Sequence, residues 1–245
     1  MSSSPLNPDW EGDGRAATFA FGGDVHFPAG TNLGDRLAAD PSTALGLTVP
    51  QLLSGVNLSM VNLESALTEG TCPAAQPKQY VFYAPPSAIS AFQGAGSPSS
   101  PTPTTTGRTA VRPASKWHWP PSSRPGTPSS ASASAAQAFT PYRTTVNGQR
   151  IAIIAATQVI DSGLQTAWAA TATEPGLAWP YDVNDLIAAV ESARQDSDTV
   201  IVYLHWGTEL DACPNPLQEP LGHALVEACA GIIVGTHAHV LLGAG

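Results

Sequence analysis

The chain has 245 residues, about the length of one α/β domain or slightly more. Only 12% of the residues are charged but 42% are apolar, which is enough to build a core, so disorder over the full length is excluded. The formal net charge of −9 argues against a nucleic-acid-binding surface, because phosphate binding needs a positive field. No apolar run reaches the roughly 20 residues that a membrane span needs.

The N-terminus and the cysteines give no targeting or redox signal. Residues 1–17 are expected to be a disordered tail, and the start at residues 1–5 has neither the basic nor the apolar region of a secretion signal. The location is therefore left open between the cytoplasm and the cell envelope. Cys72, Cys213 and Cys229 lie far apart, so neither a disulfide framework nor a zinc knuckle is predicted.

Five short runs rich in apolar and β-branched residues predict strands, at residues 18–21, 58–63, 150–155, 199–204 and 231–235. The last three are continuous apolar runs, which is typical of strands buried on both faces. Asn147-Gly148, just before the third run, is a strong signal for a two-residue hairpin turn.

Two amphipathic helices are predicted between these strands. The first begins after Asp182 as N-cap and runs to about Asp196; the second begins near Pro216 or Leu217 and is capped by Gly231. Their expected apolar stripes are Val183, Leu186, Ile187, Val190 and Ala193, and Leu217, Leu221, Leu225, Val226 and Cys229. Strands alternating with helices predict an α/β fold with a parallel sheet and right-handed crossovers.

Residues 97–134 differ in composition from both flanks. Ser, Pro and Thr supply 24 of these 38 residues, and the segment has four basic residues and no acidic one. It cannot bury enough apolar surface to offset its ordering entropy, so it is expected to be disordered. One interpretation is a low-complexity linker. The flanks, however, read as the interior of one domain, where a long structureless insert is unusual.

A frameshift in the coding sequence is the interpretation that we favour for this segment. Residues 117–120, Trp-His-Trp-Pro, are encoded by TGG-CAY-TGG-CCN, and the shifted frame reads Ala-Leu-Ala whatever the unknown bases are. Over residues 101–106 the same shift is compatible with His-Ala-Asn-Asn-His. The hidden frame can therefore encode strand, Asn-Asn-His, helix and strand.

Side chains that can ligate metals collect at the ends of four predicted strands, where ligands gather in an open parallel sheet. In chain order they are Asp24 and His26, Asn62 and Glu64, His205 and Glu209, and His237 and His239. Imidazole together with carboxylate suits Mn, Fe or Zn. Alternate residues of an extended chain project to one side, so Asp24-x-His26 and His237-x-His239 can each face an ion. A bridging Glu64 could hold two ions about 3.5–4 Å apart.

Each of these residues also has a structural explanation when it is taken alone. His205 or the His237–His239 pair could be core or surface histidines, and Asp24 or Glu64 could cap a helix. Their shared position at the ends of separate strands favours a common metal site. His223 lies in the middle of a predicted helix and is expected to be structural or a surface partner.

Four blocks resemble the capsule-synthesis protein CapA family: FGGDVH at 21–26, VNLE at 61–64, LHWGTE at 204–209 and GIIVGTHAHVL at 231–241. The resemblance covers roughly residues 18–96 and 135–245. That family is linked to poly-γ-glutamate capsule synthesis and looks related to calcineurin-like metallophosphoesterases. The resemblance implies one domain over residues 18–245, a four-layer α/β/β/α sandwich with two divalent metal ions.

The resemblance also implies residue roles. The implied ligands are Asp24, His26, Glu64, His205, His237 and His239, with His205 and His239 as catalytic residues and Asn62 and Glu209 orienting the ligands. The family carries an Asn-Asn-His block after its third strand, which this chain lacks in the written frame. The family sheet also continues beyond the position of Gly245, so the sandwich is expected to be incomplete at its C-terminus.

Two kinds of function are compatible with this reading. The first is a metal-dependent hydrolase in which two ions polarise a phosphoryl or carbonyl oxygen and activate a water, while an imidazole acts as general acid. Its substrate would be a phosphoester or an anionic polymer, and its partner the capsule-synthesis machinery. The second is a non-catalytic accessory protein for polymer synthesis or export, or an inactive fragment, because fold alone does not fix function.

Overall fold

The computed structural model describes residues 13–28, 30–67, 83–95, 104–106, 138–160, 165, 169–171, 177–178 and 183–243. Over these residues the fold is mixed α/β. One sheet contains β1 (Phe19–Val25), β2 (Leu58–Leu63) and β5 (Thr104–Thr106), all parallel, in the order β1-β2-β5. A second contains β6 (Tyr142–Val146), β7 (Gln149–Thr157), β8 (Thr199–His205) and β9 (Ile232–Thr236), in that order, with only β6 antiparallel to its neighbour.

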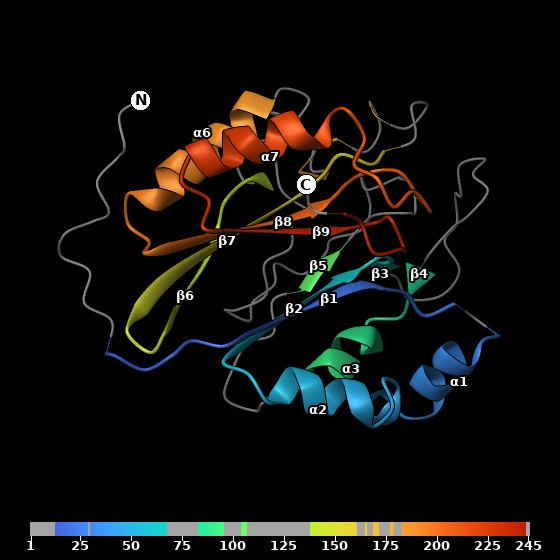
Figure 1. The fold of residues 1–245 in the computed structure, drawn as a ribbon. Coiled ribbons are helices and arrows are strands. Elements are labelled where there is room, and N and C mark those ends of the chain that lie inside the picture. The colour runs from blue at the N-terminus through green and yellow to red at the C-terminus, as the bar shows by residue number, and fades with distance from the viewer. Residues whose placement is uncertain are drawn as a thin grey trace.

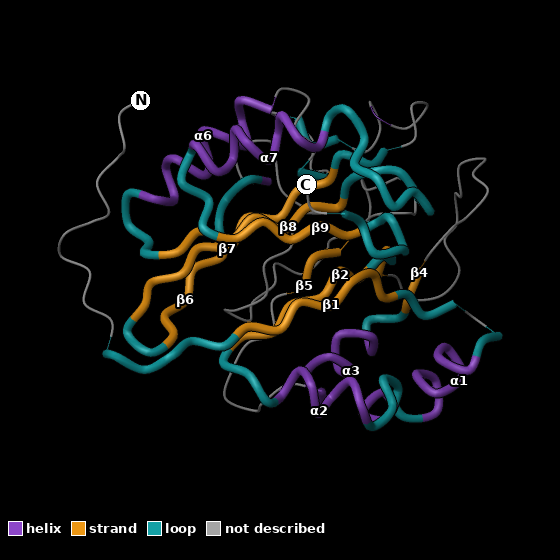
Figure 2. The backbone as a smooth tube through the Cα atoms, in the orientation of Figure 1, coloured by secondary structure: helices purple, strands orange, loops and turns teal. Residues whose placement is uncertain are grey.

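Helices lie outside the two sheets (Figure 1). Helices α6 (Val183–Arg194) and α7 (Gln218–Glu227) cover the outer face of the four-stranded sheet. Helices α1 (Asn32–Ala39), α2 (Thr48–Ser54) and α3 (Ser87–Ala95) and a 3₁₀ turn at Pro41–Thr43 lie on the outer side of the three-stranded sheet. The short strands β3 (Ala66–Leu67) and β4 (Tyr83–Ala84) form a separate parallel pair at the end of this sheet. The tube in Figure 2 shows the two sheets facing each other between these helical layers.

The space between the sheets is filled from the inner faces of both. In β8, Ile201 and Tyr203 belong to the inter-sheet core, and the next residue on that face is His205. In β2, Met60 belongs to the same core, and the next residue on its face is Asn62. Each inner face is therefore apolar along most of the strand and polar at its carboxyl end, which brings polar side chains from the two sheets together.

A β-bulge at Gly22–Gly23 interrupts β1. Phe21 pairs with Met60, whereas Asp24 pairs with Asn62, so three steps along β1 match two along β2. Side chains alternate between the faces of a strand, and one extra residue reverses the alternation that follows it. The bulge therefore turns Asp24 to the same inner face as Phe21, toward the four-stranded sheet.

The predicted strands and helices are present. The prediction for β2 matches its bounds. The predicted bounds lie within one residue of those of β8 and β9, within two of those of β7 and within four of those of β1. The parallel pairing of β7, β8 and β9 is also confirmed. Asn147 and Gly148 have φ of 49° and 79°, the positive values that a tight hairpin turn requires.

The details of the helices differ from the prediction. Leu217 and Val226 are 68% and 60% exposed, because Leu217 precedes α7 and Val226 lies away from the buried face formed by Leu221 and Leu225. The left-handed residue after α7 is Cys229, with φ of 71°, and not Gly231. The proposed N-cap Asp182 lies outside the described residues. None of the described helices is long and apolar enough to cross a bilayer.

The two segments that were expected to be disordered are described only in part. In the predicted tail, the Asp13 amide donates to the Asn147 carbonyl at 3.3 Å. Within residues 97–134, Thr104–Thr106 form β5 beside the end of β2. The remaining residues of both segments lie outside the described ones, and the domain boundaries at 17 and 18 stay predictions.

An ion pair between Arg150 and Asp198 connects the hairpin β6–β7 to the start of β8. Asp198 accepts hydrogen bonds from the backbone N–H and the guanidinium of Arg150, at 2.7 and 2.6 Å, and its side chain is only 3% exposed. These hydrogen bonds lower the pKa of Asp198, against the opposing effect of burial. We expect Asp198→Asn to reduce the free energy of unfolding by about 2 kcal/mol at pH 7 in denaturant titrations.

Asp196→Asn is the matched control, because Asp196 pairs with Arg143 but both side chains are largely exposed. Its effect should stay within about 0.5 kcal/mol. A lowered folded-state pKa contributes stability above the unfolded-state value, near 4, that is lost as the pH falls through the folded-state value. The difference between wild type and Asp198→Asn should therefore narrow below pH 4, and a constant difference would contradict this assignment.

The bulge gives a second stability prediction. A Cβ on Gly22 would lie 2.8 Å from Cγ1 of the buried Val61, whereas around Gly23 no described atom lies within 4 Å of such a Cβ. Gly22→Ala should lower the free energy of unfolding by about 1–3 kcal/mol through overpacking. Gly23→Ala should leave it unchanged or raise it slightly. Equal effects of the two substitutions would show that the bulge is not packed in this way.

Candidate functional site between the two sheets

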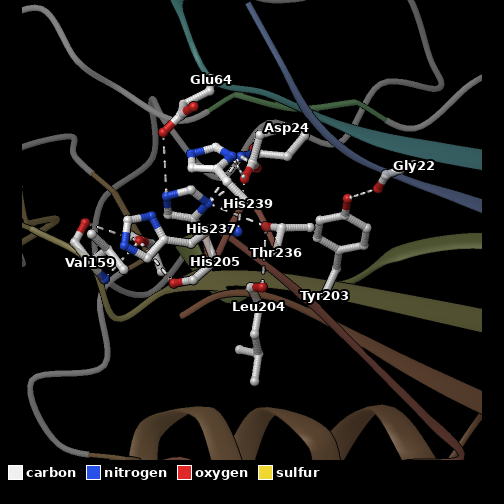
Figure 3. Close-up of polar contacts among 12 residues, drawn as sticks. Gly22, Asp24, Glu64, Val159, Tyr203, Leu204, His205, Thr236, His237 and His239 are labelled. Carbon is white, nitrogen blue, oxygen red and sulfur yellow. Dashed lines mark hydrogen bonds and ion pairs between the residues drawn. The ribbon is translucent and has the colours of Figure 1, made fainter. Parts of the chain in front are cut away.

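The polar ends of the inner faces meet in one cluster (Figure 3). It contains Asp24 from β1, Asn62 and Glu64 from β2 and the residue after it, His205 from β8, and Thr236, His237 and His239 from β9 and the loop that follows it. Residues that are 215 positions apart in the sequence thus lie in contact. The structure therefore brings together side chains that the sequence predicts to converge at one sheet edge.

Asp24 lies at the centre of the cluster, with a side chain only 3% exposed. Its Oδ1 accepts from Asn62 Nδ2 at 2.6 Å and lies 3.3 Å from His205 Nδ1, and its Oδ2 accepts from the His237 amide at 2.8 Å. Burial alone would raise the pKa of Asp24, but the hydrogen bond and charge of His205, with the donors Asn62 and His237, lower it to about 2. Asp24 is therefore a carboxylate at neutral pH.

His205 is held by three polar groups on one side of its ring. Nδ1 lies 3.2 Å from Thr236 Oγ1, 3.2 Å from Asn62 Nδ2 and 3.3 Å from Asp24 Oδ1, and the two oxygens favour the tautomer with the proton on Nδ1. Nε2 then carries the lone pair and lies 3.7 Å from Glu64 Oε1. Oriented in this way, His205 and Glu64 present two ligand atoms to the same space.

His237 occupies an unusual backbone conformation. Its φ is 95°, a region that non-glycine residues rarely adopt and that is found at functional sites. Its ring centroid lies 4.7 Å from that of His205, and its Nδ1 is buried with no hydrogen-bond partner among the described residues. Burial, with the charge of His205, lowers the pKa of His237 to about 4, so the imidazole is neutral and has a lone pair to offer.

His239 and His26 complete the set of imidazoles. His239 has a side chain 37% exposed, lies with Nδ1 3.8 Å from Asp24 Oδ2 and has its ring centroid 6.0 Å from that of His237. His26 follows β1 and is half-buried; burial lowers its pKa, and the charge of His239 acts in the same direction. The two rings therefore lie within electrostatic range of each other.

The predicted extended geometry of His237-x-His239 is wrong. β9 ends at Thr236, and His237 and His239 lie beyond it with φ of 95° and 55°. The two rings come together through this left-handed turn. The predicted orienting residues also differ: Asn62 is buried and contacts Asp24 and His205, whereas Glu209 is exposed and acts on His237 only through its charge.

Two groups of three ligand atoms are close enough to hold a metal ion. One consists of Glu64, His205 and His237, and the other of Asp24, Glu64 and His239, with the atoms of each group within 4.8 Å of one another. Glu64 belongs to both groups. Carboxylate and imidazole donors are those that Mn, Fe and Zn prefer. The buried, unpaired Nδ1 of His237 is a further sign that the cluster has room for a ligand.

The sequence reading missed two residues that support the cluster. Thr236 contacts His205 Nδ1 and donates to the Leu204 carbonyl at 3.4 Å, and Tyr203 donates through its hydroxyl to the Gly22 carbonyl. The alternation in β8 places Tyr203 and His205 on one face, which was visible in the sequence. The Gly22-Gly23 pair inside a strand was a visible signal for the bulge.

Comparison with known proteins finds related sequences for part of the chain. Residues 129–245 match the family of bacterial capsule synthesis proteins called PGA_cap. The PGA biosynthesis protein CapA of Bacillus subtilis (strain 168) is 41% identical over 96 residues, which is 39% of this chain and 24% of that protein. The capsule biosynthesis protein CapA of Bacillus anthracis is 40% identical over 99 residues, which is 39% of this chain and 23% of that protein.

The matched stretches span about a quarter of these relatives, and the family match covers only one side of the cluster. His205, Glu209, His237 and His239 lie inside residues 129–245. Asp24 and the other residues of β1 and β2 lie outside them and are joined to the matched part by the contacts described above. Over residues 129–245, the chain is therefore similar to bacterial capsule synthesis proteins.

Proposed function

We propose that the chain binds two divalent metal ions between its sheets and takes part in the synthesis of a capsule polymer of the poly-γ-glutamate kind. The observation that carries the metal site is the pair of ligand groups that share Glu64. The two CapA relatives, whose names refer to capsule and PGA biosynthesis, support the role in polymer synthesis. The order of helices and sheets supports a four-layer α/β/β/α sandwich like that of the metallophosphoesterases.

The ligand sets would divide the six predicted ligands between two ions. Glu64, His205 and His237 would hold one ion, and Asp24, Glu64 and His239 the other. His26, within electrostatic range of His239 and Asp24, would join the second set. Mn, Fe or Zn fits these donors, because each set combines carboxylate oxygen with neutral imidazole nitrogen.

Hydrolysis of a phosphoester or an amide-linked polymer is the chemistry that we assign to this site. Two bound ions supply Lewis-acid polarisation of the reacting oxygen and a water of lowered pKa. His239 is exposed, whereas His205 and His237 are only partly so, and the ring nitrogen of His239 that does not face the ion would donate a hydrogen bond to the leaving group. His205, with its ring fixed by Asp24 and Thr236, would present Nε2 to the ion that it shares with Glu64 and His237.

Burial of the site favours this chemistry. Asp24, Asn62 and Glu64 have little contact with water, so charges and dipoles near them act in a medium of lower dielectric. Their hydrogen bonds are in place before any substrate binds, and a preorganised site does not have to reorganise during the reaction.

A non-catalytic accessory role is the second candidate, and a specific observation favours it. The written sequence of residues 97–134 contains no Asn-Asn-His block, which the CapA resemblance places after the third strand. Without that amide and imidazole, the chain would keep the metal ligands but lack part of the machinery for turnover. Such a protein would bind ions and polymer without cleaving the polymer.

Metal content tests the site itself. Full-length protein reconstituted with Mn²⁺, Fe²⁺ or Zn²⁺ should retain two ions per chain after desalting, measured by elemental analysis. Glu64→Gln should lose both ions, because Glu64 belongs to both ligand groups. His223→Ala, at an exposed position of α7, is the control and should retain both ions. A wild-type chain that retains none of the three metals would refute the site.

Activity separates the two candidate functions. The reconstituted protein should hydrolyse the generic diester bis(p-nitrophenyl) phosphate, and His239→Ala should reduce kcat by about 10²–10³-fold, the usual cost of removing one hydrogen-bond donor to developing charge. His223→Ala should match wild type. Metal retention without hydrolysis of this diester or of poly-γ-glutamate would exclude the hydrolase and favour the accessory role.

A further inference from the structure

We propose that Tyr203 is a positioning residue that holds the Gly22–Gly23 bulge and thereby aims the Asp24 carboxylate at its partners. The inference rests on the proposed metal site, and it adds a residue outside the ligand sets. Tyr203 lies in β8, two residues before His205 on the same face, and its side chain is 1% exposed in the core between the sheets. Its hydroxyl donates to the Gly22 carbonyl across the gap between the sheets (Figure 3).

The bulge needs an external support because of its composition. Gly22 and Gly23 have no side chains to pack, and glycine has more backbone freedom than any other residue. The register of β1 with β2 shifts within this pair, and the face to which Asp24 points depends on that shift. A hydrogen bond from the opposite sheet to the Gly22 carbonyl fixes the bulge at the residue where the alternation reverses.

Tyr203 is suited to act as a permanent donor. Its ring packs among inter-sheet residues such as Met60 and Ile201, which fixes the position of the hydroxyl. Tyrosine has an unperturbed pKa of about 10, so its phenol keeps its proton at neutral pH. Phenylalanine would fill the same space but leave the Gly22 carbonyl without this donor.

A displaced bulge would disturb the hydrogen bonds of both carboxylate oxygens of Asp24. Oδ1 accepts from Asn62 in the same sheet, and Oδ2 accepts from the His237 amide in the other sheet. These bonds of 2.6 and 2.8 Å leave little tolerance for a shift of the backbone that carries Asp24. The effect of Tyr203 should therefore be larger at the ion held by Asp24, Glu64 and His239, which Asp24 would ligate directly, than at the ion held by Glu64, His205 and His237.

The test titrates Co²⁺ into full-length wild type, Tyr203→Phe and Ile201→Val. Calorimetry measures the affinities, and the visible d–d absorption spectrum reports the ligand geometry. Ile201→Val is the matched control, since it removes one buried methyl group from the same face of β8 and touches no part of the bulge. Tyr203→Phe should weaken one of two Co²⁺ equivalents by about tenfold or more and change the spectrum, as loss of a supporting contact to a ligand does. Ile201→Val should lower Tm but keep the wild-type affinity and spectrum.

A metal-free measurement keeps this inference separate from the proposed function. In the apo protein, Tyr203→Phe should speed hydrogen exchange of the His237 amide, which donates to Asp24, and Ile201→Val should not. Tyr203→Phe behaving like Ile201→Val in exchange, or in affinity and spectrum, would overturn the inference. Wild type that takes up no Co²⁺ would instead refute the proposed metal site, and the exchange rates alone would then decide the role of Tyr203.

Discussion

The buried carboxylate of Asp24 joins the two sheets. A carboxylate removed from water is strongly unfavourable unless donors replace the lost hydration, and Asp24 receives them from both sides of the interface, from Asn62 in one sheet and from the His237 amide beside the other. The sheets can therefore pack closely at this end only when Asp24 points inward. The β-bulge, the turn after β9 and the orientation of His205 all depend on this requirement.

The two sheets contribute different chemistry to the cluster. The three-stranded sheet supplies carboxylate oxygens through Asp24 and Glu64, and β8 and the loop after β9 supply imidazole nitrogens through His205, His237 and His239. Neither set alone contains a complete group. The family match covers the imidazole side only, so the carboxylate side is assigned from contacts between residues far apart in the sequence.

The sequence was sufficient to predict the strands and the edge at which the site forms, because alternation in β2 and β8 continues from buried apolar residues into Asn62 and His205. It was not sufficient to predict the face of Asp24, since one extra residue in β1 reverses the alternation. It also failed for His237 and His239, where tertiary contacts hold backbone angles that local preference disfavours. Leu217 and Val226 were also predicted to lie on the apolar face of a helix but are exposed. The residue at which α7 begins decides which side chains face the core.

The left-handed conformations of His237 and His239 would affect the strength with which the proposed metal site binds an ion. Such conformations cost of order 1–3 kcal/mol each, and here the cost is met when the chain folds. An incoming cation would meet ligands already in place, so none of its binding energy would be spent on ordering the loop. Its apparent affinity would also not be reduced by the need to wait for a rarely populated conformation that can bind it.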